Sequence, residues 1–314
     1  MNKTPTDLKT PVTSLLLGLA VGDALGVPVE FRPRGSFRVD GVQGYGTHNQ
    51  PPGTWSDDTS LTLCLADSLS RGFSPDDIAR NFIRWRDEAA FTAHGAVFDI
   101  GISTAKAISR LKSGAAPDQA GCAGVNENGN GSLMRIAPLV FYLTGRPEAE
   151  RFQITRTVSS ITHAHPWSVA ACFIYLEYLR KLASGTDKTA AYTELRRDFQ
   201  GGIPYIAPDT LGKFARILRT DIIALPETSI RSGGFVIDTL EAAFWCFLTT
   251  DSYRDAVLKA VNLGDDTDTT AAVTGALSGL IYGVDAIPAE WLDALAASGD
   301  IRRLAGAMAG ALAA

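Results

Sequence analysis

The sequence predicts an all-α protein, and three observations support this fold class. Apolar residues recur at helical spacing along most of the chain. Some of these stretches open with a helix-start signal, such as Ser74-Pro75-Asp76-Asp77, where proline takes the first helical position. Alternating strand patterns are nearly absent, and residues 37–42 are the only modest candidate. We therefore expect one all-α domain over residues 1–314.

The helical pattern can be followed along the chain from one loop to the next. Polar or glycine-rich segments at 32–52, 114–131 and 201–208 are expected to be loops, and none resembles a flexible domain linker. Pro166 is a second proline placed to start a helix. The alanine-rich tail after Arg303 is interpreted as an ordinary helix end or a frayed terminus. The expected helices cover residues 13–22, 61–70, 74–90, 102–111, 167–183, 188–199, 210–218, 236–248, 253–263, 270–282 and 289–304.

Bulk composition excludes several classes of protein. Of the 314 residues, 46% are hydrophobic and 20% are charged, which is typical of a soluble globular protein. The net charge of −5 and the lack of a basic run argue against nucleic-acid binding. Asp, Arg or Glu interrupts each apolar stretch, so we expect no membrane span. The N-terminus lacks an apolar signal core and the cysteines form no Cys-x-x-Cys pair, so we expect a cytoplasmic protein with reduced thiols.

Two acidic, hydroxyl-bearing clusters each precede an apolar helical stretch. The first is Trp55-Ser56-Asp57-Asp58-Thr59, and the second is Gly264-Asp265-Asp266-Thr267-Asp268-Thr269. A helix start needs one such side chain as a cap, whereas several adjacent carboxylates repel one another unless a hard cation neutralises them. If the clusters meet in the fold, they form an oxygen-only site suited to Mg²⁺ or Mn²⁺. The alternative is two independent, over-charged caps.

A third segment, residues 126–132, is rich in glycine and asparagine and leads into Leu133-Met134-Arg135. Backbone N–H groups at a glycine-rich helix start suit phosphate oxygens, although a plain loop fits the same pattern. Motifs of other chemistries are absent: the sequence lacks a P-loop, an EF-hand loop, a His-x-x-x-His pair and a Gly-x-Ser-x-Gly elbow. His163, just ahead of an apolar helix, is by pattern alone a hydrogen-bonded packing residue.

Six short motifs follow one another within residues 14–283. They are Gly22-Asp23-Ala24-Leu25-Gly26-Val27-Pro28-Val29-Glu30, the first acidic cluster, Asp99-Ile100-Gly101, Gly129-Asn130-Gly131-Ser132-Leu133-Met134-Arg135, Thr162-His163 and the second acidic cluster. In this order they resemble the ADP-ribosylglycohydrolase family, in the branch that contains dinitrogenase-reductase-activating glycohydrolase and ADP-ribosylarginine hydrolase. The resemblance implies a compact, single-domain orthogonal helical bundle around a binuclear metal site that holds two Mg²⁺ or Mn²⁺ ions.

The resemblance also implies roles for individual residues. Ser56 stands where the family more often has threonine, and its hydroxyl can make the same contact. Asp265 stands where a small residue is usual, so its carboxylate lies near the metals or caps the helix. Phe235 replaces a tyrosine that often stacks on adenine, and it keeps the ring face. The implied metal ligands are Ser56, Asp57, Asp58, Asp266, Asp268 and Thr269, the catalytic residues are Glu30, Asp57, Asp58 and Asp99, and the nucleotide-binding residues are Gly129, Gly131, Ser132, His163 and Phe235.

The implied reaction removes mono-ADP-ribose from modified arginine side chains of a protein and releases ADP-ribose. Cleavage of this N-glycosidic bond passes through an oxocarbenium-like state, so we expect an oriented water and a carboxylate base from Glu30, Asp57 or Asp58. The Asp99 motif favours arginine over two alternative linkages, ADP-ribosyl-serine and O-acetyl-ADP-ribose. A further alternative is an immunity protein that binds an ADP-ribosyltransferase toxin and blocks it.

Overall fold

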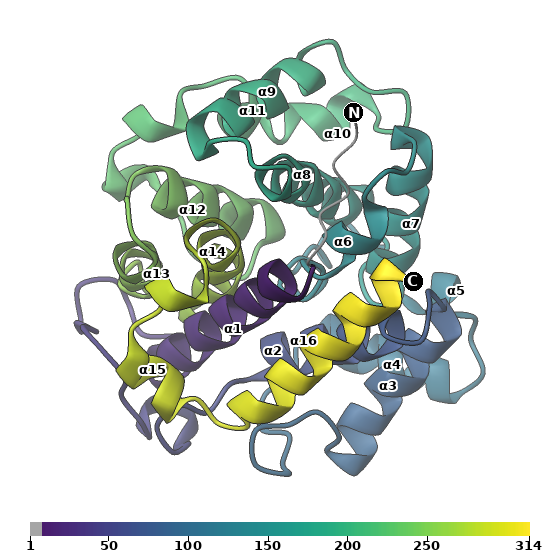
Figure 1. The fold of residues 1–314 in the computed structure, drawn as a ribbon. Coiled ribbons are helices and arrows are strands. Elements are labelled where there is room, and N and C mark those ends of the chain that lie inside the picture. Colours follow the sequence, from purple (N-terminus) through teal and green to yellow (C-terminus); the bar gives the residue numbers. More distant parts are fainter. Residues whose placement is uncertain (1–7) are drawn as a thin grey trace.

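The protein is described here by a computed structural model of residues 8–314, and those residues form helices without a β-strand (Figure 1). The predicted all-α fold class is therefore confirmed. The α-helices are α1 (Lys9–Gly26), α2 (Asp57–Leu69), α3 (Pro75–Glu88), α4 (Ile102–Lys112), α5 (Pro117–Ala120), α6 (Leu139–Leu143), α7 (Glu148–Ser160), α8 (Pro166–Ala183), α9 (Lys188–Gln200), α10 (Pro208–Gly212), α11 (Ala215–Leu218), α12 (Val236–Leu248), α13 (Tyr253–Val261), α14 (Thr267–Tyr282), α15 (Ala289–Ala294) and α16 (Ser298–Ala313).

Helices α1 and α14 pack against each other at the centre of the fold, with their backbones in direct contact. A Cβ atom on Gly18 would lie only 2.4 Å from the carbonyl oxygen of Gly275, and one on Gly26 would lie 2.3 Å from the Cα atom of Asp268. Only glycine permits so close an approach. Because of it, the end of α1 lies against the start of α14, where the second acidic cluster is found.

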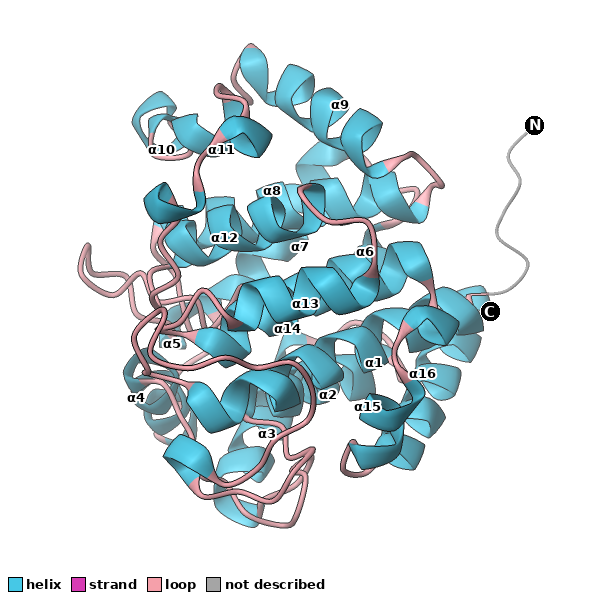
Figure 2. Cartoon of the chain, turned by 90° about the vertical axis from the view of Figure 1, so that its left-hand side faces the viewer, coloured by secondary structure: helices cyan, strands magenta, loops and turns pink. Residues whose placement is uncertain are grey.

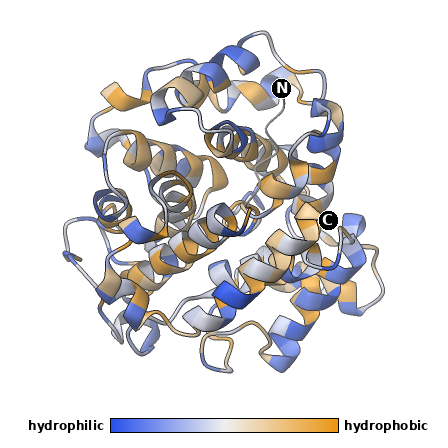
Figure 3. Cartoon of the chain, in the orientation of Figure 1, coloured by the Kyte–Doolittle hydropathy of each residue, from blue (hydrophilic) through white to orange (hydrophobic). Residues whose placement is uncertain are grey.

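The apolar core extends through many of the helices, with large contributions from α1, α8 and α12, and Figure 3 shows hydrophobic segments on these helices. The stretch Lys9–Val29, with a mean hydropathy of 1.8, is long and apolar enough to cross a membrane by length and composition. The prediction that no stretch of that kind exists is therefore wrong for this helix. Its most apolar window is 94% buried inside the fold, so its hydrophobicity is explained by packing in the core.

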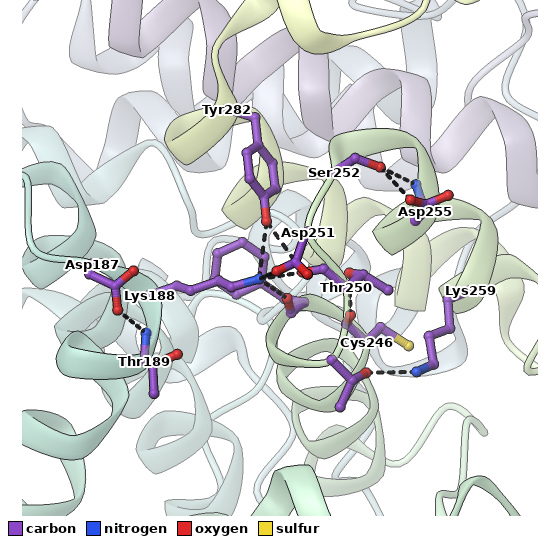
Figure 4. A network of polar contacts seen from close by, with 12 residues as sticks. Asp187, Lys188, Thr189, Cys246, Thr250, Asp251, Ser252, Asp255, Lys259 and Tyr282 are labelled. Carbon is purple, nitrogen blue, oxygen red and sulfur yellow. Dashed lines mark hydrogen bonds and ion pairs between the residues drawn. The ribbon is translucent and has the colours of Figure 1, made fainter.

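A half-buried lysine, Lys188, joins three elements in the network of polar contacts drawn in Figure 4. Lys188, at the start of α9, donates to the Asp251 carboxylate over 3.0 Å and to the Tyr282 hydroxyl over 3.2 Å, and also to the carbonyl oxygen of Thr250. Tyr282 ends α14, and residues 250–251 follow α12. This contact fixes the far end of α14, opposite the end that carries the acidic cluster.

The longer loops gather toward one side of the helices (Figure 2). One of them contains residues 37–42, the modest strand candidate, which form no strand and lie within the loop predicted at 32–52. The N–H and C=O groups of the buried Val39 pair with the side-chain amide of Asn262 over 2.9 and 2.8 Å. A side chain therefore satisfies the backbone groups that a neighbouring strand would have satisfied.

The helix predictions are confirmed in most places, but the structure differs from them at several points, and the short helices α5 and α6 were not predicted. The helix expected at 210–218 is interrupted before α11, and the one at 289–304 is interrupted between α15 and α16. At the second break Ala297 has a left-handed backbone (φ +49°), and Trp55 Nε1 donates to the Ala296 carbonyl oxygen over 2.9 Å. The helix α7 was not predicted; its buried face includes Arg151, which donates to Glu177 on α8 over 2.6 Å. The alanine-rich tail continues as α16.

Candidate functional site

The first acidic cluster is organised around Asp23, a residue of α1 to which sequence analysis gave no role. Its buried carboxylate accepts hydrogen bonds from Ser56 N (2.9 Å), Thr59 N (3.0 Å) and Thr59 Oγ1 (2.6 Å). Burial raises the pKa of Asp23 to about 6, while these hydrogen bonds act in the opposite direction. Asp23 thus caps α2 from another helix and leaves Asp57 and Asp58 free of that task.

The second acidic cluster meets the first. Thr269, in the first turn of α14, donates from Oγ1 to Oδ2 of Asp58 over 3.3 Å. Ser56, which precedes α2, donates to the same oxygen over 3.2 Å. The residues joined by the first of these bonds are 211 positions apart in sequence. The two clusters therefore form a single site, and the alternative of two independent caps is excluded.

Several carboxylate oxygens of this site are buried without a hydrogen-bond partner among the described residues. They are Oδ1 of Asp58, Oδ1 of Asp266 and Oδ2 of Asp268. Glu30 also faces this group, because one oxygen each of Glu30, Asp266 and Asp268 lie within 4.8 Å of one another. These carboxylate oxygens are buried and unpaired, and the group contains only oxygen ligands. Such a group suits a hard divalent cation better than a hydrogen-bond donor of the protein.

Burial and mutual repulsion make these carboxylates difficult to ionise together. Burial, with repulsion from neighbouring acids, raises the pKa values of Asp57, Asp58 and Asp268 well above the ordinary range. The pKa of Glu30 is raised to about 7, first by burial and then by repulsion from Asp99 and other acids. A cation bound at this site would neutralise the cluster and restore the ionised forms.

A cavity of about 500 Å³ opens beside the carboxylates. Its far side is formed by the loop Gly129–Gly131 and by His163, whose Nδ1 lies 2.9 Å from Oγ1 of Thr162. Burial lowers the pKa of His163 to about 3, so its ring is neutral. A Cβ on Gly131 would come within 2.8 Å of the His163 ring, which shows why this loop carries glycine. Of the predicted site residues, the cavity wall contains Glu30, Asp57, Asp99, Gly129, Gly131, His163, Asp266 and Thr269.

The remaining predicted nucleotide residues lie beside the cavity wall. The Ser132 hydroxyl is buried and accepts a hydrogen bond from Ser159 Oγ over 3.0 Å, so it anchors the loop to the core. Phe235 is 38% exposed next to Gly234, which does line the cavity, and its ring meets Trp167 edge to face at 6.2 Å. No helix starts directly after Gly131: residues 131–135 form turns and α6 begins at Leu139, so of the two alternatives the structure shows the loop.

Three contributors to the site were missed by sequence analysis: Asp23, His48 and Asn130. The side-chain amide of Asn130 donates to Asp266 Oδ2 and to Thr239 Oγ1, each over 2.9 Å. His48 Nε2 bonds to Oε2 of Glu30. Asp23 and Asn130 lie inside two of the six family motifs, which could have identified them as site residues. Nothing in the local sequence distinguishes His48. Asp265 is exposed with a left-handed backbone (φ +61°), and the residue that precedes α14 as its cap is Asp266.

Comparisons with known proteins identify the class. A family model described as ADP-ribosylglycohydrolase matches residues 4–314. The chain belongs to the ADP-ribosylglycohydrolase family, and its predicted resemblance is confirmed. It is a hydrolase of that family.

Individual relatives within this family carry more specific names. "ADP-ribosylarginine hydrolase Tri1" of Serratia proteamaculans is 37% identical over 92% of this chain and 76% of its own length. "ADP-ribosyl-[dinitrogen reductase] glycohydrolase" of Rhodospirillum rubrum is 30% identical over 89% of this chain and 88% of its own length. A solved "ADP-ribosylglycohydrolase-related protein complex" contains a chain with a TM-score of 0.83 and 34% identity, covering 98% of this chain and 99% of that one.

Proposed function

We propose that the protein is a metal-dependent hydrolase that removes mono-ADP-ribose from modified arginine side chains of proteins. The observation that carries this proposal is the union of two acidic clusters into one buried site with unpaired oxygens, beside a cavity of about 500 Å³. Two relatives at 37% and 34% identity carry the name ADP-ribosylarginine hydrolase, which supports arginine as the linkage. We also propose that residues 1–314 act as one domain, since one apolar cluster extends from Val12 to Ala309.

The residues that would hold the cations are Ser56, Asp57, Asp58, Asp266, Asp268 and Thr269. The chemistry that Mg²⁺ or Mn²⁺ supplies at such a site is neutralisation of charge, a grip on hydroxyl groups and activation of water.

Glu30 is the proposed general base. Its carboxylate lines the cavity, and its ionised form, which a bound cation favours, can accept a proton from a water molecule there. In the reaction the water oxygen bonds to the anomeric carbon of the ribose, and the bond from that carbon to the arginine nitrogen breaks. The electron pair of the broken bond goes to the guanidine nitrogen. Glu30 accepts one proton of the water and passes it on to the guanidine, so that guanidinium leaves and Glu30 is again ionised.

Asp99 is placed to recognise the leaving group. It lines the same cavity, and one of its oxygens lies within 4.8 Å of ligand atoms of Glu30 and His48. A carboxylate here pairs with a positively charged guanidinium, whereas the hydroxyl of a serine product carries no charge to pair. This placement supports arginine over the serine and O-acetyl linkages.

The test is ADP-ribose release from an arginine-ADP-ribosylated protein with Mg²⁺, with Mn²⁺ and with EDTA, alongside serine-linked and O-acetyl substrates. We expect release from arginine that EDTA abolishes and that Asp57→Ala and Asp268→Ala each eliminate through loss of metal. Release from serine alone would overturn the arginine assignment. Binding of ADP-ribose without hydrolysis would instead support a protein that blocks an ADP-ribosyltransferase toxin, and a toxin complex surviving Asp57→Ala would separate blocking from catalysis.

A further inference from the structure

The short 3₁₀ turn η2 (Gly46–His48) holds Glu30 at two points. Thr47 Oγ1 donates to the main-chain oxygen of Glu30 over 2.7 Å, and His48 Nε2 bonds to its carboxylate oxygen Oε2. Both ends of the glutamate are therefore fixed by consecutive residues of one turn. Among residues 8–314 the other carboxylate oxygen, Oε1, has no hydrogen bond to the protein, and the Glu30 side chain lines the cavity.

The turn itself is held firmly against the preceding segment. Gly46 has a left-handed backbone (φ +52°), and a Cβ there would lie 1.9 Å from the carbonyl oxygen of Pro28. Tyr45 N donates to the Gln50 carbonyl oxygen, and the Gln50 side chain returns a hydrogen bond to the His48 carbonyl oxygen over 3.1 Å. A loop closed in this way presents His48 in a defined position.

Aromatic contacts fix the orientation of the His48 ring. Phe98 lies at a centroid distance of 5.3 Å on one side, and Phe31 meets the ring edge to face at 6.0 Å. The side chains of His48 and Glu30 are only 13% and 6% exposed. The imidazole is thus packed into place, so its contact with Glu30 has one geometry.

We propose that His48 is a positioning residue, which holds Glu30 so that its free oxygen points at the reacting water. This inference rests on the proposed function. Glu30 belongs to two groups of side chains whose ligand atoms lie within 4.8 Å of one another: one group with His48 and Asp99, and one with Asp266 and Asp268. Without the imidazole, the carboxylate is free to turn away from the acids, because only its main chain remains bound to η2. Small displacements of a catalytic group slow a reaction strongly.

The experiment compares four variants in the full-length protein loaded with Mn²⁺. For His48→Ala we expect kcat to fall on the order of 10- to 100-fold with little change in KM. His48→Gln, whose amide nitrogen reaches the position of Nε2, restores most of the rate, whereas the shorter His48→Asn does not. His94→Ala is the matched control, since that histidine is exposed and bonds to Thr54 outside the cavity wall. We expect the ADP-ribose Kd and the Mn²⁺-induced rise in Tm to match wild type in all four.

The outcomes separate this inference from the proposed function. A wild-type protein that releases no ADP-ribose overturns the proposed function, and the inference with it. An active wild type with an unchanged kcat in His48→Ala overturns only the inference. The inference alone is also overturned if His48→Gln is as slow as His48→Ala. It is likewise overturned if His48→Ala loses the Mn²⁺-induced rise in Tm, because the histidine would then support the structure of the site and not only the position of Glu30.

Discussion

Asp265 and Asp266 are adjacent in sequence and have opposite environments. Asp265 is exposed, and its backbone N–H and C=O groups pair with Arg32 and Phe31. Asp266 accepts from Asn130 on one carboxylate oxygen, and its other oxygen is buried without a partner. At the residue scale, therefore, contacts rather than residue type distinguish a candidate ligand from a surface acid.

This contrast predicts different effects for the same chemical change. Asp266→Asn removes a charged oxygen from the proposed metal site, so we expect metal affinity and ADP-ribose release to fall on the order of 10- to 100-fold. Asparagine is compatible with the left-handed backbone at position 265, so we expect Asp265→Asn to leave metal affinity and ADP-ribose release unchanged. Calorimetric Mn²⁺ titration and a release assay on both variants measure the effects. Equal losses in the two variants would show that the exposed acid also serves the metal.

At the scale of elements, the contact between α1 and α14 places the site. A Cβ on Gly275 would lie 2.2 Å from the carbonyl oxygen of Gly18. Farther along, Thr267 Oγ1 donates to the carbonyl oxygen of Gly26 over 2.8 Å. The helices are therefore held in register up to the acidic end of α14.

We expect Gly275→Ala to lower the free energy of unfolding by about 1–3 kcal/mol, because the added methyl group forces the two helices apart. Gly310→Ala is the matched control: Gly310 lies in α16 and a Cβ there meets nothing within 4 Å. Since alanine favours helix over glycine, this control should gain about 0.5–1 kcal/mol. Urea unfolding measures both changes. A neutral or stabilising Gly275→Ala would contradict the close backbone contact.

At the scale of the whole molecule, the acidic site links stability to pH and to metal. Burial raises the pKa of Asp23 to about 6, and burial followed by repulsion raises that of Glu30 to about 7. In the unfolded chain the pKa of a carboxyl group is about 4. A raised native pKa means that the folded state binds protons more tightly, so its contribution to stability is present at low pH. That contribution is lost as the pH rises through the native values.

For the metal-free protein we therefore expect the Tm to fall between about pH 5 and pH 8. Mn²⁺ or Mg²⁺ should raise the Tm most at the upper end of this range, where the carboxylates are ionised and bind the cation. Thermal scans of EDTA-treated protein with and without added metal test this expectation, and Asp58→Asn should reduce the slope with pH. A metal-free Tm that rises from pH 5 to pH 8 would refute it.

Features that depend on local pattern could be predicted from the amino-acid sequence. The helix over Val236–Leu248 was predicted residue for residue, because its apolar periodicity and its ends are both local. The acidic helix starts were recognised for the same reason, since several adjacent carboxylates exceed what a cap requires. Residues 37–42 show the limit: a strand-like pattern occurs there, but the distant Asn262 binds the backbone of Val39 instead.

The contacts between distant polar groups follow from tertiary packing and could not be predicted from local pattern. Asp23 bonds to a residue 33 positions away, and Thr269 bonds to Asp58 across 211 positions. His48 reaches Glu30 through a loop with no recognisable motif. Local propensity cannot encode these pairs, because each joins segments that come together only in the folded chain. For Thr269 and Asp58, the glycine-mediated packing of α1 against α14 fixes the position of the acidic end of α14. The sequence thus determined the helices and the candidate ligands, and tertiary packing decided how they combine into one site.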